Sequence, residues 1–207
     1  NWTLNKGLYP NGMKPLSDLL KRDGRKLMVW FEPERVMADS IWAHEHPDWV
    51  LGRPKHETLL MNLGNPDACQ FVIDFCSAKI DEFGLGCYRQ DFNMDPLEYW
   101  QANDAEDRQG ISEIRHIEGL YRFWDALVER HPGLIIDNCA SGGRRIDLET
   151  VGRATPFWRT DGPRDAVAHQ CHSFGLHAWV PLDAISEDRE GDTYEFRSSM
   201  SSGLCIN

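Results

Sequence analysis

The chain has 207 residues with 41% hydrophobic and 27% charged side chains, a balance typical of a globular protein with one buried core. Its formal net charge of −11 disfavours nucleic acid as a partner, because an acidic surface repels phosphate. No apolar run approaches the ~20 residues that a transmembrane helix needs, so we expect no membrane partner and leave the compartment open between cytoplasm and secretion. The chain starts without an initiator methionine and ends in an apolar stretch, so we expect a fragment of a larger protein.

Short apolar runs alternate with amphipathic segments along the chain. The runs that predict buried strands are 26–32, 84–91, 133–138, 154–160 and 176–182, and 203–207 resembles the start of another strand. The expected helices lie at 65–83, where Asn65-Pro66 is a start signal and Gly84 a stop, at 114–128, and with less regular periodicity at 165–174. A polar loop is expected at 101–109.

This alternation predicts an α/β fold with a parallel sheet, which is either a (β/α)8 TIM barrel or a doubly wound sheet. Four of the five runs end in polar residues, namely Glu32, Asp91, Asn138 and Thr160-Asp161. A barrel builds its site from such strand ends. A doubly wound nucleotide fold instead needs a phosphate loop with G-x-G-x-x-G spacing, which the sequence lacks. We therefore expect the TIM barrel.

The cysteine and histidine patterns do not indicate a metal site. The six cysteines form no C-x-x-C pair and no zinc-ribbon spacing, and several lie in apolar runs, so we expect buried reduced thiols. The histidines between His169 and His177 have no glutamate beside them as in H-E-x-x-H, and His44 and His46 lie in a stretch that the motifs described below explain without a metal. We expect no metal and no cofactor.

Two aspartates at strand ends are candidates for chemistry. Arg89 lies two residues before Asp91, on the same face of a strand, and a guanidinium there favours the ionised carboxylate that a nucleophile needs. Asp161 ends another run close to Trp158, whose ring can stack on a sugar. Two carboxyl groups about 5–5.5 Å apart perform double-displacement glycoside hydrolysis, and their repulsion favours retaining a proton on one of them.

The alternative is that each aspartate is a helix cap or a turn residue, a role that Asp161-Gly162-Pro163 fits well. Spacing alone leaves both interpretations open. Glu32 and Glu34 form a rival pair of carboxylates. We interpret them as structural, because they flank Pro33 at the end of a strand.

Five motifs follow one another along nearly the whole chain. They are 8–16 (LYPNGMKPL), 30–36 (WFEPERV) with 46–51 (HPDWVL), 89–93 (RQDFN), 138–144 (NCASGGR) and 158–161 (WRTD). In this order they resemble the motifs of glycoside hydrolase family 36, the bacterial α-galactosidases of clan D.

The resemblance implies a retaining glycosidase that cleaves terminal α-linked galactose from an oligosaccharide or glycoconjugate, with Asp91 as nucleophile and Asp161 as acid/base. It implies that the substrate-binding residues are Trp30, Arg89, Asn93, Cys139, Gly142 and Trp158. It further implies that residues 1–207 are a catalytic barrel fragment with strands three to eight. The flanking N-terminal and C-terminal β-domains, through which homo-oligomers form, are then absent.

Departures from the family pattern leave the sugar open. Arg89 stands where most members have Lys, and Gln90 where they have Trp; a planar guanidinium and a point charge are not interchangeable. The aspartates with which the family's second strand grips galactose have no counterpart in the chain. One alternative is therefore an α-N-acetylgalactosaminidase with the same mechanism. An alternative of another class is a non-catalytic, sugar-binding or structural barrel fragment.

Overall fold

The computed structural model describes residues 2–52, 57–162, 165–180, 183–187, 192–200 and 203–206. The chain divides into two units. The N-terminal unit comprises Asn1–Tyr88 with Asn93–Leu134, and the C-terminal unit comprises Arg89–Phe92 with Ile135–Asn207. Strand β5, Cys87–Gln90, therefore begins in one unit and ends in the other.

The N-terminal unit combines helices with two groups of strands. Its helices are α1 Lys14–Arg22, α2 Ile41–Glu45, α3 Pro66–Phe83, α4 Leu97–Asn103 and α5 Ile111–Arg130, with 3₁₀ turns at Pro47–Trp49 and Glu106–Arg108. Its strands are β1 Met28–Phe31, β2 Arg35–Met37, β3 Val50–Leu51 and β4 Thr58–Met61, besides the start of β5. Strands β2, β4 and β3 form an antiparallel sheet, and β1 lies beside β5 in a second sheet.

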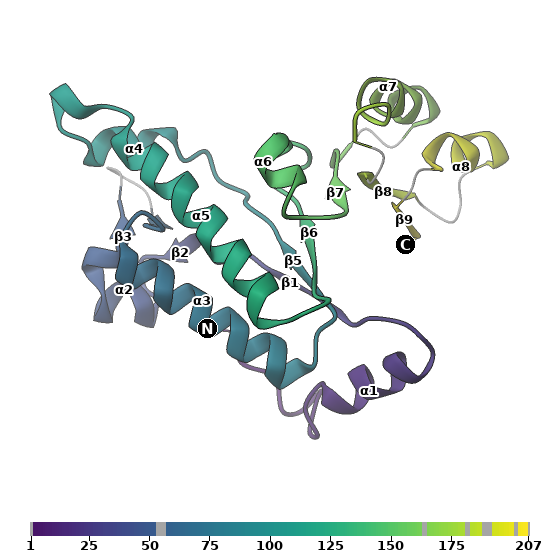
Figure 1. The fold of residues 1–207 in the computed structure, drawn as a ribbon, viewed down its shortest axis with the longest axis horizontal. Coiled ribbons are helices and arrows are strands. Elements are labelled where there is room, and N and C mark those ends of the chain that lie inside the picture. The colour runs from purple at the N-terminus through teal and green to yellow at the C-terminus, as the bar shows by residue number, and fades with distance from the viewer. Residues whose placement is uncertain are drawn as a thin grey trace. The chain divides into compact units, whose positions relative to one another are not determined.

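Helices α3 and α5 lie side by side in the N-terminal unit (Figure 1). Asn65 caps α3 by accepting hydrogen bonds from the N–H groups of Asp67 and Ala68, and Gly84 ends the helix in the left-handed conformation. The two helices bury apolar stripes with helical spacing: Ala68, Val72, Cys76 and Ile80 on α3, and Leu120, Phe123, Trp124 and Leu127 on α5. The helices expected at 65–83 and 114–128 are confirmed.

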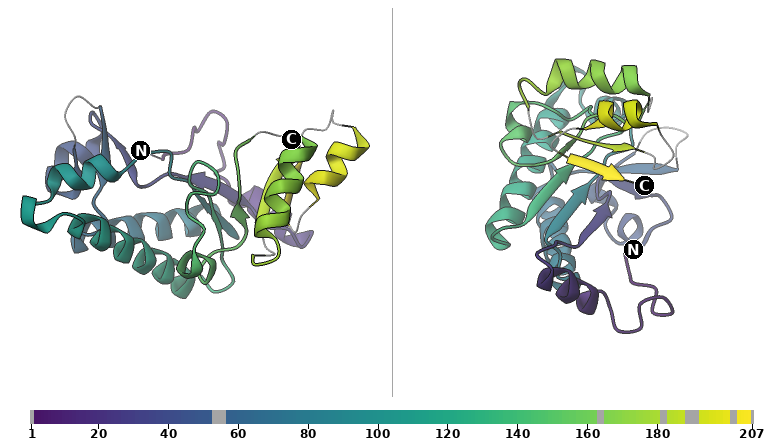
Figure 2. Two further views of the ribbon diagram at one scale, coloured as in Figure 1. Left: turned by 90° about the horizontal axis from the view of Figure 1, so that it is seen from above. Right: turned by 90° about the vertical axis from the view of Figure 1, so that its right-hand side faces the viewer.

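The C-terminal unit alternates strands with helices. Its strands are the end of β5, β6 Ile135–Asn138, β7 Phe157–Trp158, β8 Asp183–Glu187 and β9 Gly203–Ile206. Strands β6 to β9 pair in parallel, with Asn138 opposite Phe157 and Trp158 opposite Ala184. Helices α6 Leu148–Val151, α7 Ala166–Leu176 and α8 Thr193–Ser199 connect them. Both views of Figure 2 show α7 and α8 side by side.

The expected α/β fold with a parallel sheet is confirmed. The strand order is β1-β5-β6-β7-β8-β9, and the runs at 26–32, 84–91, 133–138 and 154–160 each contain one of these strands. The stretch 203–207 contains β9, and the expected helix at 165–174 is α7. A complete eight-stranded barrel is not shown by the strands of the described residues.

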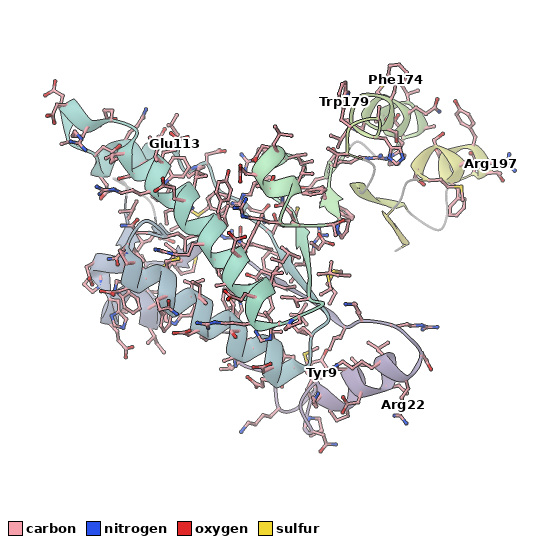
Figure 3. All side chains as sticks on the ribbon, viewed as in Figure 1. Tyr9, Arg22, Glu113, Phe174, Trp179 and Arg197 are labelled. Atoms are coloured by element: carbon pink, nitrogen blue, oxygen red, sulfur yellow. The ribbon has the colours of Figure 1, made fainter. Side chains whose placement is uncertain are left out.

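The expectation of a strand at 176–182 is wrong. Helix α7 extends through Leu176, and the chain then turns, because Trp179 and Val180 both donate backbone hydrogen bonds to the Leu176 carbonyl. Trp179 is 85% exposed, and Figure 3 shows its side chain standing out beside α7. An apolar run is therefore not a buried strand here; the next strand, β8, follows at Asp183, and residues 181–182 lie outside the described residues.

The expectation of a polar loop at 101–109 is wrong in part. Helix α4 continues to Asn103, because Tyr99 and Trp100 anchor its inner face in the core while its polar residues face solvent. A 3₁₀ turn follows at Glu106–Arg108. The five cysteines with described side chains are free, and all but Cys171 are buried.

Candidate active site

Asp91 directly follows β5 and is held from two sides in the C-terminal unit. Its side chain is 8% exposed. Its Oδ1 accepts hydrogen bonds from the backbone N–H groups of Phe92 at 2.8 Å and Ser141 at 3.3 Å. The thiol of Cys139 also forms a hydrogen bond with Asp91. These hydrogen bonds fix the orientation of the Asp91 carboxylate.

The segment that supplies Ser141 is a tight turn at residues 139–144, here called the glycine loop. Ser141 and Gly142 both have positive φ, 46° and 82°, and the Ala140 N–H donates to the Gly142 carbonyl at 3.0 Å. Positive φ at Ser141 is unusual for a residue with a side chain. Cys139 N–H donates to the Gln90 carbonyl at 2.8 Å, which ties the loop to the strand before Asp91.

Asp161 lies three residues after Trp158, the last residue of β7, and its carboxyl group is exposed. Trp158 Nε1 donates a hydrogen bond to Asp161 Oδ1 at 2.8 Å. A Cβ atom added to Gly142 would lie 3.0 Å from the Asp161 nitrogen and 3.1 Å from Thr160 Cα. Only glycine allows such a close approach at that φ. The glycine loop therefore contacts both the Asp91 side chain and the backbone of Asp161.

Arg89 has a partner that the sequence did not reveal. Its NH1 donates to Asp137 Oδ1 at 2.9 Å, and both side chains are mostly buried. Its guanidinium lies 4.4 Å from the ring centroid of Trp158. Asp137 is one residue before Asn138, the polar strand end that the sequence did identify. Because side chains alternate along a strand, the side chains of Asp137 and Asn138 are expected on opposite faces of β6.

Burial dominates the protonation of two groups near Asp91. Desolvation raises the pKa of Asp137; the Arg89 charge opposes this effect, and the negative charge of Asp91 adds to it. Desolvation raises the pKa of Cys139 to about 12, and Asp91 contributes in the same direction. Cys139 is therefore a thiol at neutral pH, so that it can donate a hydrogen bond to the Asp91 carboxylate.

Trp30 and Asn93 belong to the N-terminal unit. Trp30 lies on β1 and is 44% exposed, as a residue that contacts a ligand must be. Asn93 has an exposed side chain, and its backbone N–H donates to Glu32 Oε1. The six residues expected to bind sugar therefore divide between the units, with Arg89, Cys139, Gly142 and Trp158 around the two aspartates.

The rival carboxylates Glu32 and Glu34 are both buried in the N-terminal unit and both have partners there. Glu32 pairs with Arg35, and Glu34 Oε2 lies 2.8 Å from His116 Nε2. The burial and the pairing of both glutamates agree with their interpretation as structural residues.

Neither a metal site nor a membrane-spanning helix is present among the described residues. They contain no group of three or more His, Cys, Asp or Glu side chains arranged to hold a metal ion. Among their helices, none combines the length and the apolar character that crossing a membrane requires.

Comparison with known proteins gives a consistent picture. A family model described as Melibiase matches residues 1–191. The α-galactosidase of Escherichia coli is 30% identical over 195 residues, which cover 89% of this chain and 26% of that protein. The α-galactosidase AgaA of Geobacillus stearothermophilus is 27% identical over 191 residues, with the same two coverages.

The fold also matches solved structures. The crystal structure of an α-galactosidase from Lactobacillus brevis aligns with the whole chain at a TM-score of 0.85 and 23% identity, over 30% of its own length. AgaA is a member of glycoside hydrolase family 36, and the structure of an AgaA variant in complex with raffinose also aligns with the whole chain. The TM-score is 0.84 and the identity 23%, over 31% of the AgaA chain. The chain spans about a quarter of the length of the curated relatives that it matches.

Proposed function

The chain belongs to the Melibiase family, and we propose that the protein containing it hydrolyses terminal α-linked galactosides with retention of configuration, using Asp91 as nucleophile and Asp161 as acid/base. The observation that carries the proposal is the glycine loop, which contacts the Asp91 side chain through Ser141 and the Asp161 backbone through Gly142. One turn after β6 thus contacts the residues that follow β5 and β7, the two strands on either side of β6 in the sheet. Identity of 30% to a curated α-galactosidase supports the choice of sugar.

In the first step, a carboxylate oxygen of Asp91 attacks the anomeric carbon while the bond to the leaving oxygen breaks. Asp161 transfers its proton to that oxygen, and a galactosyl ester of Asp91 remains. Hydrogen bonds from Phe92 N–H and Ser141 N–H hold Oδ1 of Asp91 and so orient the carboxylate for attack.

In the second step, water attacks the same carbon from the face that the leaving group vacated. Asp161, now ionised, takes a proton from this water, and the ester bond to Asp91 breaks. Two inversions give net retention. The exposure of Asp161 suits this role, because the residue must exchange protons with leaving group and water. The buried position of Asp91 suits a group that reacts only with a bound sugar.

We assign sugar contacts to Trp30, Arg89, Asn93, Cys139, Gly142 and Trp158. The exposed indole of Trp30 offers an apolar face to a pyranose ring. Arg89 takes the place of the Lys that holds sugar hydroxyls in most members of the family. Its pairing with Asp137 leaves further guanidinium N–H groups for this purpose.

In this proposal the chain supplies strands three to eight of a (β/α)8 barrel, over residues 1–207. The match to about a quarter of each relative agrees with a catalytic core that works together with further domains. Homo-oligomers would form through those domains. Galactosyl oligosaccharides are the proposed substrates, in line with the raffinose bound by the AgaA variant.

The test uses the natural polypeptide that contains this chain, whatever its length. A fluorinated galactosyl substrate that forms a slowly hydrolysed ester is expected to label the peptide containing Asp91, as read by mass spectrometry. Asp91→Ala and Asp161→Ala are each expected to lower kcat by at least about 100-fold on nitrophenyl α-galactoside. The matched control is Asp107→Ala, at an exposed position in the 3₁₀ turn at Glu106–Arg108, which is expected to keep the full rate.

Each rival interpretation gives a different result. A higher rate on nitrophenyl α-N-acetylgalactosaminide than on the galactoside would replace the proposed sugar and keep the mechanism. An unlabelled Asp91 peptide, or a nearly full rate in either aspartate variant, would reject the assigned roles. Sugar binding without turnover would indicate the non-catalytic alternative.

A further inference from the structure

Four side chains of the C-terminal unit form a continuous series that ends on Asp161. Asp137 accepts a hydrogen bond from Arg89, Arg89 stacks on Trp158, and Trp158 donates its indole N–H to Asp161. The contacts measure 2.9, 4.4 and 2.8 Å in that order. Three different strands contribute to the series, because Arg89 lies on β5, Asp137 on β6 and Trp158 on β7.

The last contact of the series, between the Trp158 indole and Asp161, orients an exposed carboxyl group. Asp161 is exposed, and within the described residues the indole of Trp158 is the hydrogen-bond donor to its carboxyl group. With Oδ1 held by that N–H, the other oxygen is the one that carries the proton. A general acid must present its proton to the leaving oxygen within hydrogen-bond reach. The orientation of the indole ring therefore controls proton transfer.

The first two contacts control the orientation of the indole ring. A cation above an aromatic face is attracted by the ring, so Arg89 restrains the plane of Trp158. Arg89 in turn has a flexible side chain that needs an anchor, and the buried Asp137 carboxylate supplies it. Among the described residues, no hydrogen bond joins Asp137 to Trp158 or Asp161, so its influence on them runs through Arg89.

We propose that Asp137 is a positioning residue that, through Arg89 and Trp158, orients the carboxyl group of Asp161 for proton transfer to the leaving group. The proposal rests on the proposed function, since it assigns Asp161 as the general acid. If the pair of Asp137 and Arg89 were purely structural, its loss would lower the rates of all substrates alike, because a distorted fold affects attack and protonation together. A positioning residue instead affects the substrates that need the proton.

The test compares kcat/KM for aryl α-galactosides whose leaving groups range from 2,4-dinitrophenol to phenol. Dinitrophenolate departs without a proton, whereas phenol needs one, and kcat/KM reports only the first step. Asp137→Asn is expected to lower kcat/KM by about 10- to 100-fold on phenyl galactoside and by less than about threefold on the dinitrophenyl substrate, inside the range of general acid catalysis. Asp137→Glu, which retains a carboxylate for Arg89, is expected to recover most of the loss.

Two further variants complete the design. Trp158→Phe keeps an aromatic ring for Arg89 and for the sugar contact but removes the indole N–H, so the same selective loss is expected. This variant decides the matter if Asp137→Asn does not fold. Glu149→Gln breaks the surface ion pair with Arg153 in the same unit and is expected to change neither rate.

The outcomes separate this proposal from the function on which it rests. Equal losses on both substrates, or no loss on either, in Asp137→Asn and Trp158→Phe would overturn the positioning role. If the unmodified protein cleaves no aryl galactoside, or Asp161→Ala shows no dependence on the leaving group, the proposed function itself fails.

Discussion

Gly119, in the middle of α5, lies against the backbone of Leu63, and the structure allows the effect of adding one methyl group to be calculated. A Cβ atom at this position would lie 2.1 Å from the Leu63 carbonyl oxygen and 2.6 Å from its carbonyl carbon. Ordinary contact begins at 3.4 Å, so the two segments would have to separate by about 1.3 Å. Leu63 is completely buried, and no flexible side chain can absorb the shift.

Two effects of Gly119→Ala oppose each other. Alanine is a better helix former than glycine by about 1 kcal/mol. Overpacking a close-packed core costs about 1–3 kcal/mol, and contact with backbone atoms places this site at the upper end of that range. We expect a net loss of about 2 kcal/mol, equivalent to a fall in Tm of about 4–8 °C for a chain of this size.

The measurement is urea and thermal unfolding of the two proteins, followed by tryptophan fluorescence. Gly175→Ala is the matched control, because Gly175 also lies in a helix, α7, but has open space where the Cβ would go. This control is expected to be neutral or to stabilise by up to about 1 kcal/mol. An unfolding free energy for Gly119→Ala equal to or above that of the unmodified protein would refute the close contact between α5 and Leu63.

Four other predictions concern stability and reactivity. Asn65→Ala removes the cap of α3 and is expected to lower the unfolding free energy by about 1 kcal/mol in urea titrations. His116→Ala removes the partner that hydrogen-bonds to buried Glu34 and is expected to cost about 3–5 kcal/mol; Glu113→Gln, at the exposed position on the same helix that Figure 3 labels, should stay within about 0.5 kcal/mol. Burial raises the pKa values of Cys76 and Cys139 to about 12, so iodoacetamide at pH 8 is expected to modify the exposed Cys171 and spare both, as peptide mass spectrometry will show. The same two thiols retain their protons in the folded protein after their unfolded counterparts ionise, so stability is expected to fall as pH rises from about 9 towards 12.

Much of the fold follows from local patterns in the sequence. The stripes of α3 and α5 have a helical period, and Asn65 and Gly84 mark the ends of α3 by their own chemistry. Short helices and strands carry too few residues for such a pattern, which is why α2, α6 and the antiparallel strands β2, β3 and β4 were not predicted. The run at 176–182 was wrongly predicted to be a strand, since apolar residues in a sequence do not reveal whether the rest of the protein buries them.

The two aspartates could be identified from the sequence because each ends an apolar run and each lies in a motif. Their surroundings could not. The contact between Ser141 and Asp91 joins residues 50 positions apart, and the pair of Arg89 and Asp137 joins residues 48 positions apart. No local rule relates residues so distant in the chain.

The sequence by itself thus determined the α/β class, the long helices, the candidate aspartates and the resemblance to a glycosidase family, because periodicity, caps and motifs are properties of neighbouring residues. Only the tertiary structure decided that Asp137 anchors Arg89, that Arg89 lies over Trp158, and that the glycine loop contacts both aspartates. These contacts depend on which strands become neighbours in the sheet. The packing of the whole chain selects those neighbours, and no short segment specifies them.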